Sequence, residues 1–143
     1  MNEDKNRNIN QKRKEKTTIL KNWERDLRRG LLQLMILMLI RLRTQEAHGY
    51  GLIKLIQETG IELKAGTIYA LLKRMEKDGL ITSIIAFDPE ADDSGLPKKF
   101  YTITEYGDDM IEGMVETYSS YHESINMWYQ EINNQNIKRT VKK

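Results

Sequence analysis

Apolar residues in the segment 63–81 fall on one side of a predicted helix. Four of them follow the i, i+3, i+4, i+7 spacing that gives a continuous apolar stripe: Ile68, Leu71, Leu72 and Met75. Gly79 follows at a point where helices commonly end in a left-handed residue. We therefore predict a helix over 65–77 that packs on a core through this stripe.

The opposite face of the same helix is polar and cationic. It carries Lys64, Thr67, Tyr69, Ala70, Lys73, Arg74 and Lys77. Such a face suits a polyanion, because it combines positive charge, hydrogen-bond donors and one small residue that permits close approach. The same pattern also describes an ordinary solvated surface helix. The neighbouring segments are needed to distinguish a nucleic-acid-binding helix from a solvated one.

The flanking segments predict a helix-turn-helix followed by a wing. The glycine-rich segment 47–51 precedes a short helix over 50–59, and a brief linker then leads into the helix over 65–77. Branched and aromatic residues indicate strands at 81–87 and 98–104, joined by a loop with two prolines. The predicted fold class is mainly α with a small β-wing: a winged helix-turn-helix plus long N- and C-terminal dimerisation helices.

The N-terminal third of the chain changes from a polar, basic segment to an apolar helical pattern. Residues 1–16 are almost devoid of apolar side chains, which predicts a flexible basic arm. From residue 17 the pattern becomes helical, and residues 31–42 are apolar nearly all round, which indicates burial on more than one side. We therefore assign residues 17–104 to a DNA-binding domain with its N-terminal helix, and expect a second subunit to cover part of that helix.

The C-terminal part reads as one long helix over 105–133, capped by Thr104 and followed by a basic tail over 134–143. Its apolar residues recur at a heptad-like spacing from Tyr118 onward, which is typical of a helix that packs on another helix. The predicted dimer interface comprises Leu31, Leu34, Met38, Met114, Tyr118, Tyr121, Ile125 and Trp128.

Composition narrows the range of functions. The formal net charge is only +2, but it is unevenly distributed: residues 1–30 hold ten Lys or Arg against five acids, and residues 82–112 hold eight acids against two Lys. The chain has no cysteine, and its two histidines lack a second ligand at metal spacing, so we expect no metal and no cofactor. We find no nucleophile elbow, phosphate loop or acid pair, and therefore expect no enzyme.

The longest apolar run, residues 31–42, spans about a dozen residues, whereas a bilayer requires roughly 20. We read it as a buried helix rather than a membrane anchor or signal peptide, and expect a soluble, cytoplasmic protein without membrane contact.

Several motifs resemble those of one known family. The order H-G-Y at 48–50, GTIYALLKRMEKDGLI at 66–81 and KKFYTITEYG at 98–107 resembles the PadR family of winged-helix transcriptional regulators over about half the chain. The resemblance implies a homodimer bound to operator DNA, with the helix over 65–77 in the major groove, the wing on the flanking backbone, and dimerisation through the first and last helices. The wing loop departs from the pattern, because it carries Glu90, Asp92 and Asp93 where relatives are often glycine-rich or basic.

We select the DNA-binding residues from the cationic helix face and the second strand. They are Lys64, Thr67, Tyr69, Lys73, Arg74, Lys98 and Lys99, with Lys73 and Arg74 assigned to phosphates. Lys98 and Lys99 point to opposite faces of a strand, so only one of them can face DNA. His48 is expected to satisfy a backbone group in its turn.

The resulting hypothesis is a regulator that acts as a repressor and binds, as a homodimer, a pseudo-palindromic operator in double-stranded DNA. Aromatic residues of the last helix, namely Tyr118, Tyr121 and His122, could line a cavity for a small, flat aromatic effector. The alternative is a winged-helix module for protein-protein assembly without specific DNA readout, because fold does not fix function.

Overall fold

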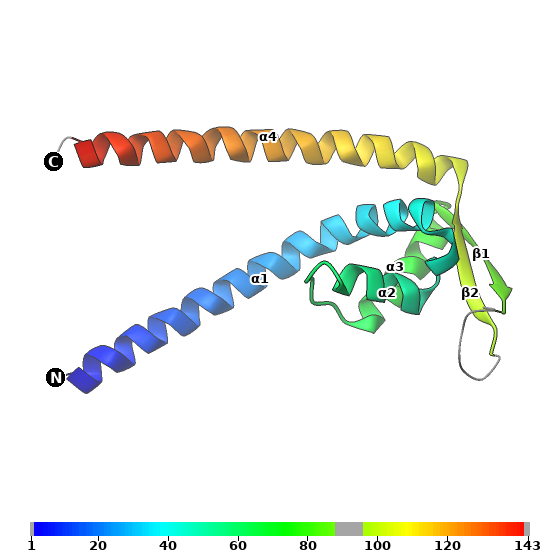
Figure 1. The fold of residues 1–143 in the computed structure, drawn as a ribbon, viewed down its shortest axis with the longest axis horizontal. Helices are drawn as coiled ribbons and strands as arrows, with labels where there is room; N and C mark the ends of the chain where they lie inside the picture. Colours follow the sequence, from blue (N-terminus) through cyan, green and yellow to red (C-terminus); the bar gives the residue numbers. More distant parts are fainter. Residues whose placement is uncertain (1, 88–95, 142–143) are drawn as a thin grey trace. The chain divides into compact units, whose positions relative to one another are not determined.

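The computed structural model describes residues 2–87 and 96–141 of the chain (Figure 1). Its elements, in chain order, are helix α1 (Asn2–Leu42), the short 3-10 helix η1 (Thr44–Glu46), α2 (Gly49–Gln57), α3 (Ala65–Lys77), strands β1 (Ile81–Ala86) and β2 (Lys98–Ile103), and α4 (Glu105–Val141). The chain divides into two compact units, which meet between Ile36 and Leu37. The fold class predicted from the sequence, a mainly helical winged helix-turn-helix, is confirmed.

The first unit consists of the N-terminal part of α1, which is helical from Asn2 onward. This differs from the flexible arm predicted for residues 1–16, and Gly30 does not interrupt the helix. All side chains over 2–27 are exposed, so burial does not explain the helix. The explanation is local: the segment holds no proline or glycine before Gly30, carries ten Lys or Arg, and has Glu3 and Asp4 in its first turn.

The second unit has a core made by the last residues of α1 together with α2, α3 and β1. Fully buried side chains come from each of these elements: Leu37, Ile40, Leu52, Ile56, Ile68, Leu72, Met75 and Ile81. The stripe on α3 is therefore buried as the apolar spacing predicted, and α3 has the predicted bounds of 65–77. Helix α2 begins one residue earlier than expected, because His48 caps its start, and it ends two residues earlier, at Gln57.

Helix α3 ends in the left-handed turn that the sequence predicted. Gly79 has φ +78°, its N–H donates to the Glu76 carbonyl at 3.1 Å, and the Leu80 N–H donates to the Met75 carbonyl at 3.0 Å. This pair of hydrogen bonds is the Schellman arrangement, which satisfies carbonyls that the helix end leaves open. The chain then enters β1 at Ile81, so the wing follows the second helix of the helix-turn-helix directly.

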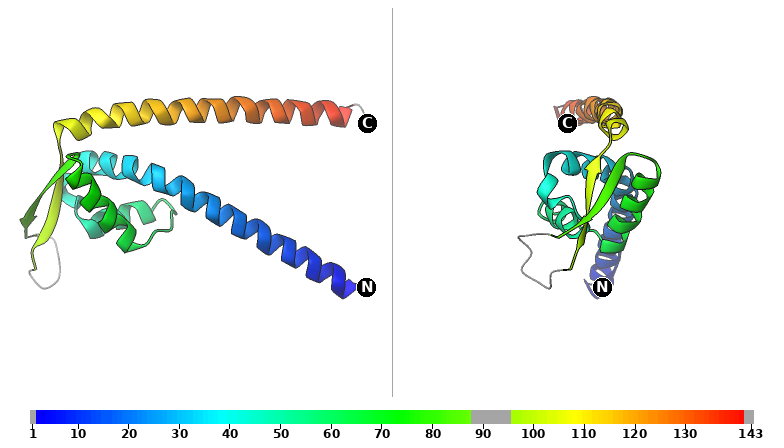
Figure 2. Two further views of the ribbon diagram at one scale, coloured as in Figure 1. Left: turned by 180° about the vertical axis from the view of Figure 1, so that it is seen from behind. Right: turned by 90° about the vertical axis from the view of Figure 1, so that its right-hand side faces the viewer.

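The wing is a two-stranded antiparallel sheet in which β1 and β2 lie side by side (Figures 1 and 2). Its register runs from Ile81 opposite Ile103 to Ala86 opposite Lys98. A third segment joins the sheet at β2, because the Tyr101 N–H donates to the Ala47 carbonyl at 2.7 Å. The acidic wing-loop residues named above, 90, 92 and 93, lie outside the described residues.

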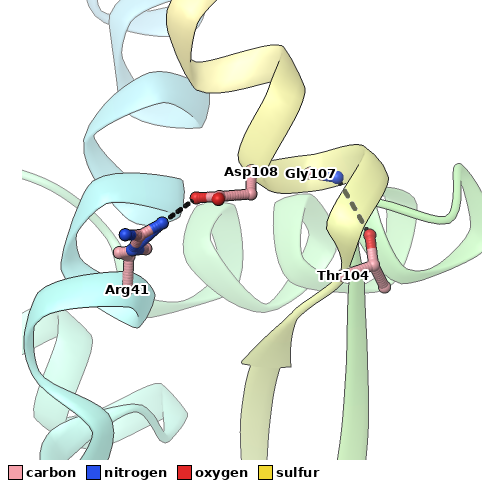
Figure 3. A network of polar contacts seen from close by, with 4 residues as sticks. All are labelled: Arg41, Thr104, Gly107 and Asp108. Carbon is pink, nitrogen blue, oxygen red and sulfur yellow. Dashed lines mark hydrogen bonds and ion pairs between the residues drawn. The ribbon is translucent and has the colours of Figure 1, made fainter.

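Helix α4 starts where β2 ends, and Thr104 caps it as predicted. The Gly107 N–H donates to the Thr104 hydroxyl oxygen at 2.9 Å, and Arg41 forms an ion pair with Asp108 in the first turn of the helix (Figure 3). Gly107 has no room for a side chain, since a Cβ there would lie 2.1 Å from the Leu80 carbonyl oxygen. The helix continues to Val141, beyond the predicted end at 133, through a segment without glycine or proline.

Candidate nucleic-acid interface

Helix α3 presents its buried stripe inward and its polar set outward. The five predicted contacts from this helix and its N-cap are all exposed: Lys64, Thr67, Tyr69, Lys73 and Arg74. Lys64 is the N-cap residue with extended backbone (φ −95°, ψ 138°), and its side chain makes no capping bond. The structure therefore leaves all five side chains exposed on the second unit, while the same helix holds the core together.

Tyr69 belongs both to this surface and to the packing beneath it. Its side chain is 51% exposed, yet its ring lies against the backbone of Gly49 at the start of α2. A Cβ on Gly49 would lie 2.2 Å from Tyr69 Cε1 and 2.8 Å from the hydroxyl oxygen. Gly49 therefore permits this approach, because a residue with a side chain at this position would displace the Tyr69 ring.

The wing is tied to α3 through Glu76. The Ser83 hydroxyl of β1 donates to Glu76 Oε1 at 2.7 Å, and Lys99 Nζ of β2 lies 3.2 Å from Glu76 Oε2. The hydrogen bond from Ser83, followed by the contact with Lys99, lowers the pKa of the Glu76 carboxyl below its ordinary value. This carboxylate thus joins both strands of the wing to α3 and offsets part of the charge of Lys99.

His48 has the structural role expected for a turn histidine. Its Nδ1 accepts a hydrogen bond from the Gly51 N–H at 3.2 Å and so caps α2. The side chain is 8% exposed, and its ring meets the ring of Phe100 edge-on with centroids 5.2 Å apart. Together with an isolated bridge to Phe100, these contacts attach the start of α2 to β2.

A cavity of about 320 Å³ lies where α2, α3 and β2 meet. It brings together one predicted contact from α3, Tyr69, and both predicted contacts from the wing, Lys98 and Lys99. Its walls also include Tyr50 and Tyr101, which sequence reasoning did not single out. The signal for them was present, because both tyrosines belong to the H-G-Y and K-K-F-Y motifs, but the motifs do not show that the two rings share a cavity.

One of these phenols is buried. Tyr101 is 8% exposed, and desolvation raises the pKa of its hydroxyl, although Lys99 acts in the opposite direction. The Lys99 ammonium lies 5.8 Å from the centroid of the Tyr101 ring. Tyr101 therefore stays a neutral phenol at physiological pH and can act as a hydrogen-bond donor.

The predicted dimer-interface residues occupy two helices. Leu31, Leu34 and Met114 are half-buried, whereas five others are exposed in the single chain: Met38, Tyr118, Tyr121, Ile125 and Trp128. Of the three residues assigned to an effector cavity, Tyr118 and His122 stack with ring centroids 5.7 Å apart, and Tyr121 is 69% exposed. His122 Nε2 also lies 3.1 Å from Asn126 Nδ2.

Neither a candidate metal site nor a candidate membrane span occurs within residues 2–87 and 96–141. Within these ranges, no three His, Asp or Glu side chains gather closely enough to hold a metal ion. No helix in the same ranges is both long and apolar enough to span a membrane.

A helix-turn-helix whose second helix exposes a cationic face, followed directly by a two-stranded wing, defines the winged-helix class of DNA-binding domains. The family model described as "Transcriptional regulator PadR-like family" matches residues 36–113, which is more than half of the chain. The chain therefore belongs to the PadR-like family of transcriptional regulators and is a DNA-binding regulator rather than an enzyme.

Solved structures agree with this assignment. The chain is similar to a PadR family transcriptional regulator from Eggerthella lenta (26% identity, TM-score 0.63), with 77% of this chain and 91% of that chain covered. It is also similar to a PadR-like transcriptional regulator from Bacillus cereus (29% identity, TM-score 0.60, 73% and 97% covered). A third similar structure is a putative transcriptional regulator from Thermoplasma acidophilum (29% identity, TM-score 0.60, 71% and 92% covered). No curated protein matches the chain.

Proposed function

We propose that this regulator is a repressor that binds a pseudo-palindromic operator as a homodimer, with α3 in the major groove and the wing against the backbone. The observation that carries the proposal is the arrangement of α3. Its apolar stripe is buried, while Lys64, Thr67, Lys73 and Arg74 are exposed on a helix short enough to enter a groove. Two such helices, related by a dimer axis, would read half-sites roughly one helical turn apart.

The first experiment selects bound duplexes from a random pool and then measures their affinity by fluorescence anisotropy at two salt concentrations. A palindromic site bound at least about a thousandfold tighter than bulk DNA is the expected result. Weak binding that selects no sequence and disappears with salt would contradict specific readout.

The backbone role of Lys73 has its own test. Its exposed ammonium is assigned to a phosphate, so Lys73→Ala should weaken binding to all sequences alike and lower the salt slope by about one unit. Lys138→Ala, which removes the same charge from an exposed position on α4, is the matched control and should leave the slope unchanged. An unchanged slope for Lys73→Ala would remove this residue from the footprint.

The homodimer is proposed from exposed apolar side chains and from charge. Tyr121, Ile125 and Trp128 are exposed on α4 at heptad-like spacing, and such apolar seams are typical of helix-helix interfaces. Residues 105–137 carry seven acids and no Lys or Arg, whereas residues 2–29 of α1 carry ten Lys or Arg and five acids. We infer that the acidic helix of one protomer packs against the basic helix of its partner.

Sedimentation velocity tests this interface with two aspartate variants of α4. Ile125→Asp places a charge in the seam and should raise the dimer dissociation constant at least about a hundredfold, because an unpaired charge is costly to bury. Ser120→Asp adds the same charge at an exposed position outside the seam and should leave the dimer intact. A monomeric wild type, or an Ile125→Asp variant that remains dimeric, would contradict the assignment.

An effector response is proposed for the aromatic part of α4. The stacked Tyr118 and His122 rings, with the exposed Tyr121 ring one turn away, offer flat apolar surfaces that a planar aromatic compound could contact between two α4 helices. Quenching of tryptophan fluorescence by a panel of planar aromatics, lost in Tyr118→Ala, is the expected outcome. The absence of any response in the wild type would count against an effector at this place.

The wing gives one observation in favour of the assembly module as the second candidate. Ile84 and Ile85 point to opposite faces of β1 and are both exposed, as is Phe87. Apolar side chains on both faces of a strand are better suited to protein than to phosphates. Unselective, salt-sensitive DNA binding in the selection experiment would favour this candidate.

A further inference from the structure

Helix α1 carries a row of exposed cations with a seven-residue repeat. The row consists of Arg7, Lys14 and Lys21, which we call the basic stripe, and all three side chains are exposed. Because seven residues make nearly two turns of a helix, the three side chains lie on one side of α1 and are spaced by about 10.5 Å. Over the described length of α1, no ion pair joins any of them to an acid of that helix.

Helix α4 carries an acidic counterpart with the same repeat. The counterpart consists of Asp109, Glu116 and Glu123, which we call the acidic stripe, and these side chains are also exposed. Over the described length of α4, no ion pair joins any of them to a cation of that helix. The two stripes therefore have opposite charge, the same spacing and the same length of about 21 Å.

Both stripes lie away from the exposed apolar side chains of their helices. At about 100° per residue, each stripe lies roughly 150° around its helix from these apolar residues. They are Leu20, Trp23 and Leu27 on α1, and Tyr121, Ile125 and Trp128 on α4. In the homodimer proposed above, the apolar residues face the partner protomer, so the two charged stripes remain on the outside.

The charge pattern along each helix favours a charged partner over water alone. An exposed helix that is stable by itself typically places opposite charges one turn apart, because such pairs stabilise it. Here like charges lie one turn apart, namely Lys21 and Arg25 on α1 and Glu112 and Glu116 on α4. Like-charge pairs weaken an isolated helix, and a stripe of opposite charge on a neighbouring helix would offset that repulsion.

We propose that two dimers associate through these stripes, with the basic stripe of one dimer packed along the acidic stripe of the other. The partner is a second copy of this chain because the repeats match. Rows with a seven-residue period wind around both helices in the same left-handed sense, so all three positions stay opposed when the helices cross at about 20°.

The association rests on the proposed homodimer and extends it. Exposed ion pairs are individually weak, so the three pairs have to act together. The contact is therefore strongest where two dimers are already close to each other, as on neighbouring operators of one duplex. It would make the occupation of such operators cooperative.

Reversal of the central charge of each stripe tests the pairing. Lys14 and Glu116 are opposed whether the two helices run parallel or antiparallel. Sedimentation velocity at up to about 1 mM wild-type protein, the range of effective concentrations on a shared duplex, should show species larger than the dimer. These species should form at about 0.05 M salt and disappear at about 0.5 M salt, where the charges are screened.

Each single variant should weaken the association about tenfold, because an attractive pair becomes a repulsive one. Lys14→Glu lowers the net charge and Glu116→Lys raises it, so net charge cannot explain a loss common to both. The double variant, and an equimolar mixture of the two single variants, should recover the association because unlike charges are again opposed. Lys54→Glu is the matched control at an exposed position of α2 and should associate as the wild type does. Circular dichroism of each variant tests whether its helices are intact.

The possible failures are distinguishable. A wild type that remains a dimer at low salt, or single variants that associate as the wild type does, would overturn the pairing of dimers and leave the homodimer in place. A wild type that sediments as a monomer would overturn the homodimer itself. If no species above the dimer forms and Lys14→Glu lowers the salt slope of DNA binding while Lys54→Glu does not, the basic stripe binds nucleic acid and the proposal is wrong.

Discussion

Thr104 joins three parts of the second unit through one hydroxyl group, and its removal should be costly. The hydroxyl donates to the Gly79 carbonyl at 2.6 Å, with the Leu80 carbonyl at 3.0 Å, and it accepts from the Gly107 N–H at 2.9 Å (Figure 3). Thr104→Val keeps the shape of the side chain but loses both functions. Loss of a helix N-cap costs about 1 kcal/mol, and loss of the donated hydrogen bond costs about another 1 kcal/mol.

The expected decrease in the free energy of unfolding is therefore about 2 kcal/mol. Urea unfolding followed by circular dichroism measures it, at one fixed protein concentration because a dimer's stability depends on concentration. Thr104→Ser retains the hydroxyl and should lose less than about 0.8 kcal/mol, the contribution of one buried methylene. A Thr104→Val protein within about 0.5 kcal/mol of wild type would refute the reasoning that this hydroxyl fastens α4 to the end of α3.

Three further changes test other contacts by the same assay. Gly79→Ala forces a residue with a side chain to φ +78° and should lower the free energy of unfolding by about 1–2 kcal/mol. Gly107→Ala places a Cβ against the Leu80 carbonyl oxygen and should lower it by about 1–3 kcal/mol, and a neutral result would contradict the close approach. Glu76 has a lowered pKa in the folded protein, so its contribution is present above the ordinary glutamate pKa and is lost as pH falls through the folded pKa. Glu76→Gln should therefore be less stable than wild type at pH 7, and the difference should shrink toward pH 3; a constant difference would exclude the carboxylate as its source.

The helix-turn-helix was predictable because its signals are local. The buried stripe of α3 has the 3.6-residue period, and Gly79 marks its end, so both bounds followed from residues within the helix itself. The cap on α4 was predictable for the same reason, since Thr104 acts on an amide three residues away. His48, which caps α2 three residues ahead, belongs with them.

The extent of the two long helices was not predictable by the same reasoning. Residues 1–16 are predicted to form an arm because they cannot bury apolar surface, and α4 is predicted to end where the heptad-like seam ends. In the structure both helices continue through exposed segments that contain no glycine or proline. Burial and helicity are separate properties, and the prediction had joined them.

The cavity could not be predicted from the sequence because its walls come from segments that lie far apart along the chain. Tyr50, Tyr69 and Tyr101 come from three elements whose mutual distance no local pattern encodes. The Glu76 to Lys99 ion pair has the same character, since it depends on how the hairpin lies against α3. The sequence predicts that Lys98 and Lys99 alternate along the strand. That Lys99 pairs with Glu76 of α3 depends on how the hairpin packs.

The bond from the Tyr101 N–H to the Ala47 carbonyl has a consequence for the dynamics of the wing. A two-stranded hairpin alone is only marginally stable in water, whereas this hairpin is paired along β2 with the residues that begin α2. Hydrogen exchange at the Tyr101 amide then requires the start of α2 to separate from the wing. We expect the wing and the helix-turn-helix to open as one cooperative unit. Both parts would then bind DNA as one rigid body.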